Sequence, residues 1–87
     1  MTFEFDPAKS AANKAKHGLS FEEAQALWTG RTISVPLTFT NEPRQLVIGK
    51  IAGKPWTAVV TDRGSALRLI SVRRARKKEA QIYEEAQ

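Results

Sequence analysis

The residues best suited to chemistry form a basic run near the C-terminal end of the sequence. Seven arginines and lysines occur between positions 63 and 78, and no acidic residue interrupts them. They are half of the 14 basic residues in a chain with a formal net charge of +5. Such a stripe favours a polyanion, because each neutralised phosphate releases counterions. A solvated helix face or a surface that pairs with an acidic protein would explain it equally. The residues are Arg63, Arg68, Arg73, Arg74, Arg76, Lys77 and Lys78.

The composition excludes several kinds of catalytic site. With no cysteine and one histidine, a thiolate or histidine-cluster metal site has no ligands. The five glycines are isolated, the acids are scattered, and no Ser-His-Asp arrangement is legible. What remains is chemistry by Arg, Lys, His and Tyr, which suits cleavage of RNA with its 2′-hydroxyl as internal nucleophile. The protein then positions the backbone, stabilises charge at phosphorus and moves two protons, and we expect no metal or other cofactor.

The length and composition predict one globular domain over residues 1–87. A chain of 87 residues with 41% hydrophobic content suffices for one small core. It contains no long apolar run, and its first residues do not resemble a signal peptide. The lack of cysteine suits a reducing compartment, so we expect a cytoplasmic protein that does not contact a membrane.

Capping signals predict two helices, and composition predicts a third. Asp6-Pro7 opens the first, which Gly18 ends, and Ala8, Ala11, Ala12 and Ala15 give it a narrow small-residue face. Residues 20–23 form the capping box of a second helix, which Gly30 stops and whose apolar stripe is Phe21, Ala24, Leu27 and Trp28. The composition from Arg73 to about Ala86 predicts the third.

Alternating apolar residues predict the strands of an α+β fold. Residues 2–6 have the pattern of a short edge strand, and the remaining strands are expected at 31–37, 44–52, 56–61 and 66–72. The predicted order is therefore β-α-α-β-β-β-β-α. Because hairpins join successive strands, we expect an antiparallel sheet of four to five strands with the helices on one face.

Two blocks of the sequence together resemble the BrnT family of type II toxins. The first reads Phe3-x-Phe5-Asp6-Pro7-x-Lys9, then Asn13-x-x-Lys16-His17-Gly18-Leu19-Ser20-Phe21-Glu22-Glu23-Ala24. The second reads Asp62-Arg63-Gly64, Leu67-Arg68-Leu69-Ile70-Ser71-Val72-Arg73-Arg74-Ala75, Lys78-Glu79 and Tyr83-Glu84. The resemblance covers nearly the whole chain in order and is weakest over residues 31–44.

This resemblance implies a RelE-like fold and an endoribonuclease activity that slows growth. It also implies neutralisation by a cognate BrnA-like antitoxin with a ribbon-helix-helix DNA-binding domain. The pair would form a heterotetramer that contacts operator DNA only through the antitoxin and represses its own operon.

Arg73 and Arg74 are the first candidates for stabilising the transition state. They are expected where a buried strand meets a helix, and residues at such a junction can direct their guanidinium forks at one phosphate. Alternatives are a salt bridge to Glu23 or Glu79, or a contact with the antitoxin.

Arg63 and Arg68 are the next candidates. Arg63 lies in a predicted tight turn, where it serves either catalysis or solvation. Arg68 alternates with Leu67 and Leu69, so we expect it on the opposite face, together with Ile70 and Val72. A charge in mid-strand indicates a face that meets solvent, an acid or RNA.

His17 and Tyr83 are the candidate proton carriers. Histidine is the usual proton carrier of proteins near neutral pH, but in the last turn of a helix a cationic His is also favoured by the helix dipole alone. Lys16 beside it has the same two interpretations. Tyr83 could donate a proton or stack on a base, or pack the last helix on the sheet.

General phosphate contacts are expected from Lys50, Lys54, Arg76, Lys77 and Lys78, unless these residues only form solvated surface. Trp28 and Trp56 are interpreted as core residues, although Trp56 could also form a stacking platform. The alternative function is a non-catalytic basic module that binds nucleic acid or the antitoxin, with a purely electrostatic arginine cluster.

Overall fold

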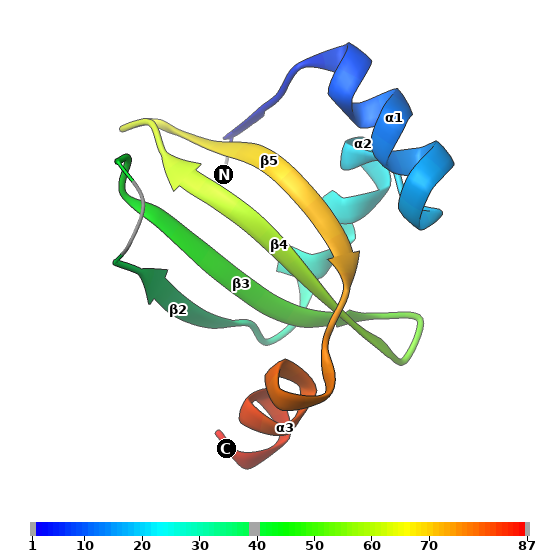
Figure 1. The fold of residues 1–87 in the computed structure, drawn as a ribbon, viewed down its shortest axis with the longest axis vertical. Helices are drawn as coiled ribbons and strands as arrows, with labels where there is room; N and C mark the ends of the chain where they lie inside the picture. The colour runs from blue at the N-terminus through cyan, green and yellow to red at the C-terminus, as the bar shows by residue number, and fades with distance from the viewer. Residues whose placement is uncertain (1, 39–40, 87) are drawn as a thin grey trace.

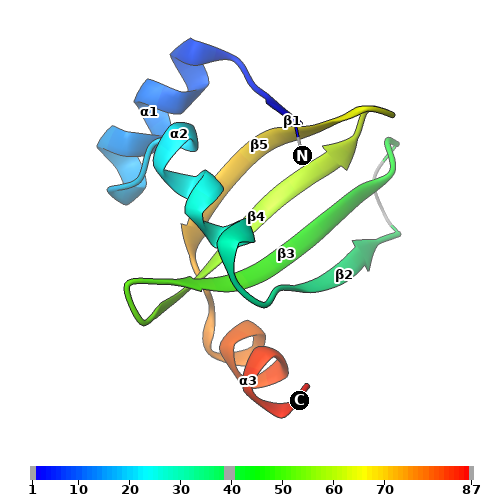
Figure 2. The same cartoon turned by 180° about the vertical axis from the view of Figure 1, so that it is seen from behind.

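The computed structural model describes residues 2–38 and 41–86 and has the predicted order of elements. In the described ranges, one mixed sheet has the strand order β1-β5-β4-β3-β2 (Figures 1 and 2). None of the helices in these ranges has the length and apolar character needed to cross a membrane. The elements are β1 (Thr2–Glu4), α1 (Pro7–His17), α2 (Phe21–Ala24), the 3₁₀ helix η1 (Gln25–Thr29), β2 (Ile33–Leu37), β3 (Arg44–Ile51), β4 (Lys54–Asp62), β5 (Ala66–Arg74) and α3 (Lys77–Glu85).

The predicted helix caps are confirmed. The Asp6 side chain accepts a hydrogen bond of 2.9 Å from the backbone N–H of Ala8. Gly18 ends α1 in the left-handed conformation, with φ of 85°, which glycine adopts without steric cost. Ser20 and Glu23 form the reciprocal capping box at the start of α2.

The antiparallel prediction holds for strands β2 to β5 and is wrong for the first strand. β1 pairs in parallel with β5, with Phe3 opposite Leu67. A hairpin forces its two strands to run in opposite directions, but nearly the whole chain connects β1 to β5. No turn therefore dictates their relative direction. The short connection between β3 and β4 also differs from prediction, because β4 already begins at Lys54.

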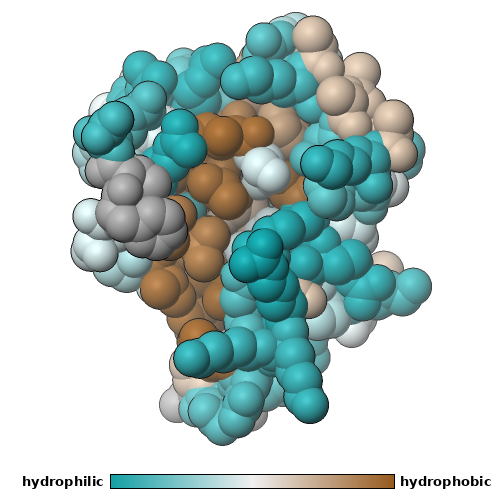
Figure 3. All heavy atoms as spheres, in the orientation of Figure 1, coloured by the Kyte–Doolittle hydropathy of each residue, from teal (hydrophilic) through white to brown (hydrophobic). Residues whose placement is uncertain are grey.

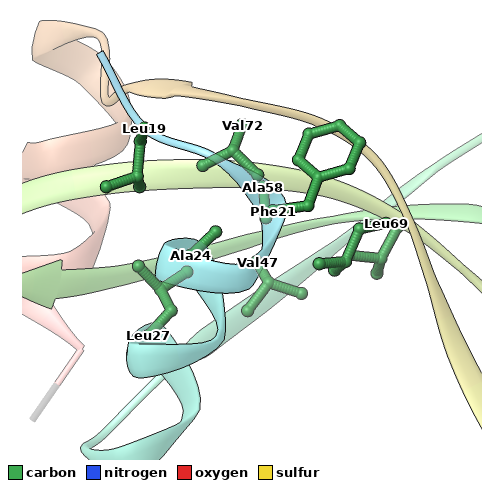
Figure 4. Packing of buried hydrophobic residues seen from close by; sticks show 9 residues of the cluster. Leu19, Phe21, Ala24, Leu27, Val47, Ala58, Leu69 and Val72 are labelled. Atoms are coloured by element: carbon green, nitrogen blue, oxygen red, sulfur yellow. The ribbon is translucent and has the colours of Figure 1, made fainter. Parts of the chain in front are cut away.

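One face of the sheet carries the apolar core. Phe21, Ala24 and Leu27 of α2 and η1 pack against the sheet (Figure 4). The side chains of the sheet in this cluster are Val47, Ala58, Val60, Leu69 and Val72. Trp28 and Trp56 are half-buried and pack against the same cluster, as predicted for core residues.

The third helix lies on the opposite face, so the expectation of helices on one face is wrong. Thr57 alternates with Ala58 in β4 and therefore points away from the core. Its hydroxyl donates a hydrogen bond of 3.0 Å to Glu79 of α3. The chain crosses from one face to the other between β5 and α3 (Figure 1).

Helix α1 turns polar residues towards the protein. The four alanines of the predicted small-residue face are exposed, whereas Ser10 and Asn13 are buried. Asn13 Nδ2 donates to the Val72 carbonyl at 2.8 Å, and the Val72 N–H donates to Asn13 Oδ1 at 3.2 Å. Asn13 thus supplies hydrogen-bond partners to the backbone N–H and carbonyl of Val72, where β5 extends beyond the end of β1. An apolar side chain could not do this.

Strand β5 is longer and less regular than predicted. Val59 is opposite Ser71 and Val60 is opposite Leu69, which leaves Ile70 as an extra, bulged residue. The bulge reverses the alternation of side chains, so Val72 points into the core and does not share the face of Arg68. β5 extends to Arg74, and α3 begins only at Lys77; the predicted start of a helix at Arg73 is therefore wrong.

Candidate functional site

Arg73 forms a largely buried ion pair with Glu79. Its Nη1 and Nη2 lie 2.7 and 2.8 Å from Glu79 Oε1 and Oε2, a bidentate arrangement. The two side chains are 19% and 11% exposed, so little water screens the pair. Of the alternatives considered from the sequence, a salt bridge to Glu79 is present. The arginine joins the end of β5 to α3.

Glu79 is held in its ionised form by this network. The bidentate contact with Arg73 is the largest cause that lowers the pKa of Glu79 to about 2. The Arg76 N–H and the Thr57 hydroxyl also donate to Glu79 Oε1, at 2.8 and 3.0 Å. The same carboxylate raises the pKa of Arg73. The pair therefore stays charged at neutral pH.

Arg74 points to the other side of the sheet, because neighbouring residues of a strand alternate. It is paired with Trp56 in the ladder, and its guanidinium carbon lies 5.5 Å from the centroid of the Trp56 ring. The sequence-based premise that Arg73 and Arg74 direct their forks at one phosphate is therefore wrong.

Arg63 and Arg68 meet at the other end of β5. Arg63 Nε lies 4.0 Å and Arg68 Nη1 3.4 Å from Glu4 Oε1 of β1. Arg68 and Arg73 project from the same face of the sheet, separated by roughly 15 Å of strand. Cations thus occupy both ends of β5 on this face.

Tyr83 packs α3 onto the sheet. Its hydroxyl donates to the Arg31 carbonyl at 3.0 Å, and the Arg31 guanidinium carbon lies 4.0 Å from its ring centroid. The same guanidinium donates to the carbonyls of Tyr83 and Ala86 at the end of α3. No local signal in the sequence indicates this role for Arg31, because its partners lie more than 50 positions away.

The other predicted phosphate contacts are spread over exposed surface. Lys50 Nζ lies 2.7 Å from Glu84 Oε1 and 5.8 Å from the Tyr83 ring centroid. The remaining four are Lys54, the first residue of β4, and Arg76, Lys77 and Lys78 around the start of α3.

His17 lines a cleft of about 260 Å³ between α1 and β5. Lys9 and Lys16 extend from the same helix, and Ile70 and Ser71 contribute the strand side. Asn13 fixes the spacing of the two walls through its hydrogen bonds to Val72. Lys9 and Ser71 were not among the candidates chosen from the sequence. The period of a helix places Lys9, Asn13 and Lys16 on adjacent turns, which was the available signal.

The structure thus brings together a histidine, two lysines and a serine at the cleft. Ser71 also belongs to the sheet face that carries Arg73, two residues further along β5. The other four catalytic candidates lie outside the residues that line the cleft. Within residues 2–38 and 41–86, no group of three or more His, Cys, Asp or Glu side chains could hold a metal ion.

The profile of one protein family, described as the ribonuclease toxin BrnT of type II toxin–antitoxin systems, matches residues 5–79. The chain belongs to the BrnT family. The matched region contains the cleft, both ends of β5 and the Arg73–Glu79 pair. No curated protein matches the chain.

Membership of the BrnT family makes this protein a ribonuclease toxin with an RNA substrate and a cognate antitoxin. The substrate and the basic composition agree, because the net charge of +5 favours association with a polyanion. The cleft beside β5 is concave, and Lys9, Lys16 and His17 line it.

Proposed function

We propose that this BrnT toxin cuts RNA without a metal, by attack of a 2′-hydroxyl on the adjacent phosphate, at the cleft between α1 and β5. The observation that carries the proposal is the position of His17. It is the only histidine of the chain and lines a cleft together with Lys9 and Lys16. At about 260 Å³ the cleft is smaller than typical small-molecule sites, which suits a phosphate with part of its sugar.

The roles follow from the chemistry of the step. The 2′-oxygen bonds to phosphorus, the bond from phosphorus to the 5′-oxygen breaks, and the products are a 2′,3′-cyclic phosphate and a 5′-hydroxyl. Neutral His17 accepts the 2′-hydroxyl proton. Lys9 and Lys16 stabilise the charge that develops on the phosphoryl oxygens, and a lysine ammonium or a water protonates the leaving oxygen.

The predicted catalytic arginines lie outside the cleft, where they bind neighbouring phosphates or hold β5 in position. Arg63 and Arg74 are exposed and bind neighbouring phosphates, as Arg68 does from the sheet face. Arg73 keeps its charge beside Ser71 but shares it with Glu79, so it positions the end of β5. Tyr83 is disfavoured as a proton donor, because its hydroxyl already donates to the Arg31 carbonyl.

We also propose that the cognate antitoxin carries a ribbon-helix-helix DNA-binding domain and forms a heterotetramer with the toxin in the cytoplasm. Operator DNA would then be bound by the antitoxin alone. Light scattering of the purified complex tests the stoichiometry, because a 2:2 assembly has twice the mass of a 1:1 pair.

The proposed mechanism is tested by cleavage of a defined RNA oligonucleotide in EDTA, with analysis of the product ends. Wild-type protein is expected to give cyclic phosphate ends, and His17→Gln to be slower by roughly 10²- to 10⁴-fold. Lys16→Gln should also slow cleavage. Lys14→Gln is the matched control, because Lys14 is exposed on the same helix and pairs with Glu23 at 2.8 Å. A requirement for a divalent metal, 3′-hydroxyl products, or full activity of His17→Gln would refute the mechanism.

One observation favours a second candidate, a basic module that holds RNA without cutting it. The most strongly predicted catalytic arginine, Arg73, is engaged with Glu79. Under this alternative, folded wild-type protein binds the oligonucleotide but leaves it intact, and its expression does not fragment cellular RNA.

A further inference from the structure

The sheet face that carries α3 is apolar and only partly covered. The ladders align three rows of side chains across strands β2 to β5 on this face. The row Ile33–Ile48–Thr57–Arg73 lies at the end that α3 covers, where Glu79 contacts Thr57 and Arg73. Figure 3 shows apolar side chains gathered over the sheet on this face, bordered by hydrophilic ones.

The middle row runs Val35–Leu46–Val59–Ser71 and is half-buried throughout. A solvated sheet face normally carries polar side chains, so three neighbouring apolar residues in one row indicate a surface that a partner covers. We call Val35, Leu46 and Val59, with the neighbouring Leu37, the open apolar face. Its row ends at Ser71, which lines the cleft of His17.

The charged side chains that the strands direct to this face are all positive. The charged side chains that β2 to β5 direct to it are Arg44, Lys50, Arg68 and Arg73. The carboxylates that meet them come from other elements: Glu79 and Glu84 of α3, and Glu4 of β1. A complementary ligand is therefore apolar along its centre, and acids at its margins would share these cations with Glu4, Glu79 and Glu84. RNA satisfies the second requirement but offers no aliphatic surface for the first.

The open edge of the sheet does not favour strand addition. β2 is the edge strand next to this face's apolar row, at the opposite side of the sheet from β1, and Pro36 removes one of its backbone donors. A partner is thus better accommodated across the face than along the edge. An amphipathic helix laid into an apolar, basic-rimmed face is an established mode of protein recognition.

We propose that the open apolar face binds an amphipathic, acid-flanked helix of the cognate antitoxin, and that this helix ends against Ser71 and closes the His17 cleft. The existence of an antitoxin rests on membership of the BrnT family, and the closing of the cleft rests on the proposed function. Binding is measured without cleavage, so failure of the cleavage mechanism would leave the docking test intact.

The chain contains no cysteine, which makes single-cysteine footprinting direct. Val35→Cys places a thiol on the open apolar face, and Ser34→Cys places one on the neighbouring residue of the same strand, on the opposite face. Each full-length variant reacts with a maleimide, alone and with the purified cognate antitoxin, defined as the protein whose co-expression restores growth. Thermal unfolding checks that both variants fold. Leu46→Cys and Gln45→Cys form a second pair on β3.

With free antitoxin at about ten times Kd, the reaction of Val35→Cys is expected to slow roughly tenfold, since only unbound toxin reacts. Ser34→Cys should change less than about twofold under the same conditions. Equal slowing at both positions would overturn the proposal in favour of strand addition at β2. No slowing at either position, or protection of Val35→Cys by an RNA oligonucleotide but not by antitoxin, would overturn it as well.

Discussion

The two faces of the sheet are stabilised by different physical means. On one face, Phe21, Ala24 and Leu27 close an apolar core in which each is at most 1% exposed. On the other, α3 is attached by an ion pair, a capping carboxylate and a cation over Tyr83. The first arrangement depends on the area removed from water, and the second on the geometry of a few polar atoms.

Because of this difference, the residues that stabilise the fold are largely distinct from those that we propose bind a partner. The apolar core leaves no surface exposed for a partner, because protein interiors are packed as densely as organic crystals. The polar attachments leave Val35, Leu46 and Val59 half-buried, in a row that ends at Ser71 of the cleft. Substitutions in the apolar core and in the attachments of α3 should therefore act on stability, whereas substitutions in the open apolar face should act mainly on partners.

The largest expected effect is on the covered face. Phe21→Ala should lower the free energy of unfolding by about 4 kcal/mol, because it removes a fully buried ring. Leu46→Ala, on the open apolar face, should cost about 1 kcal/mol, since less of its surface is buried. Urea unfolding followed by circular dichroism measures both. Similar losses for the two variants would erase the distinction between the faces.

The next effect concerns the ion pair that attaches α3. Glu79→Gln should cost about 3 kcal/mol at pH 7, because it leaves the Arg73 charge uncompensated. The pKa of Glu79 is lowered from 4.5 to about 2, so its contribution is complete above pH 4.5 and is lost as pH falls towards 2. Stability measured across this window should fall more steeply in wild type than in Glu79→Gln.

Glu23→Gln is the matched control for that titration. Glu23 also has a lowered pKa, chiefly because Lys14 donates to it, but it is exposed on the surface. Its replacement should change the pH profile less than Glu79→Gln does. An identical acid profile in wild type and Glu79→Gln would show that the pair does not stabilise α3.

A smaller effect is expected at the boundary of the two faces. Asn13→Ala removes both hydrogen-bond partners of Val72 and should cost about 2 kcal/mol. The exposed Ala11→Ser, on the same helix, should be nearly neutral. Amide exchange at Val72 reports the change directly, and an unaltered rate in Asn13→Ala would contradict the role of Asn13 as an edge cap.

The smallest effect concerns the far end of α3. Arg31→Ala should cost about 1 kcal/mol, because the cation over Tyr83 and the bonds to the helix end are lost while the core stays intact. Arg31→Lys should recover only part of this, since lysine lacks the planar fork. Exchange of the α3 amides is the measurement, and faster exchange in β4 instead would contradict the assignment.

The helix boundaries set by local signals were predictable. Asp6, Gly18 and the Ser20–Glu23 box act within four residues of the groups they satisfy, so the sequence contains the whole interaction. The end of β5 was not predictable in this way. Arg73 and Arg74 remain extended because they pair with Thr57 and Trp56 of β4, a long-range contact that outweighs their helical composition.

The sequence indicated which residue types could form a site, but not which of these residues lie close together in the structure. Glu79 was correctly named as a possible partner of Arg73, whereas the role of His17 as a proton carrier stays a prediction. The opposite directions of Arg73 and Arg74 follow from the extra length of β5, and the place of Arg31 from contacts with the chain's last helix. The assigned catalytic roles stay predictions until the cleavage experiment is done.

The parallel pairing of β1 with β5 has a consequence for how the toxin is made. Residues 2–4 join residues 66–68, and Asn13 joins Val72 across 59 positions, so the contacts are among the most distant the chain offers. Contacts of this kind form slowly, and synthesis at 5–20 residues per second takes roughly ten seconds for the chain. Both walls of the cleft therefore come together only after Val72 has been synthesised. If RNA is cut at this cleft, as we propose, a nascent chain that has not reached Val72 has no assembled site, and the antitoxin has that time to reach each new copy.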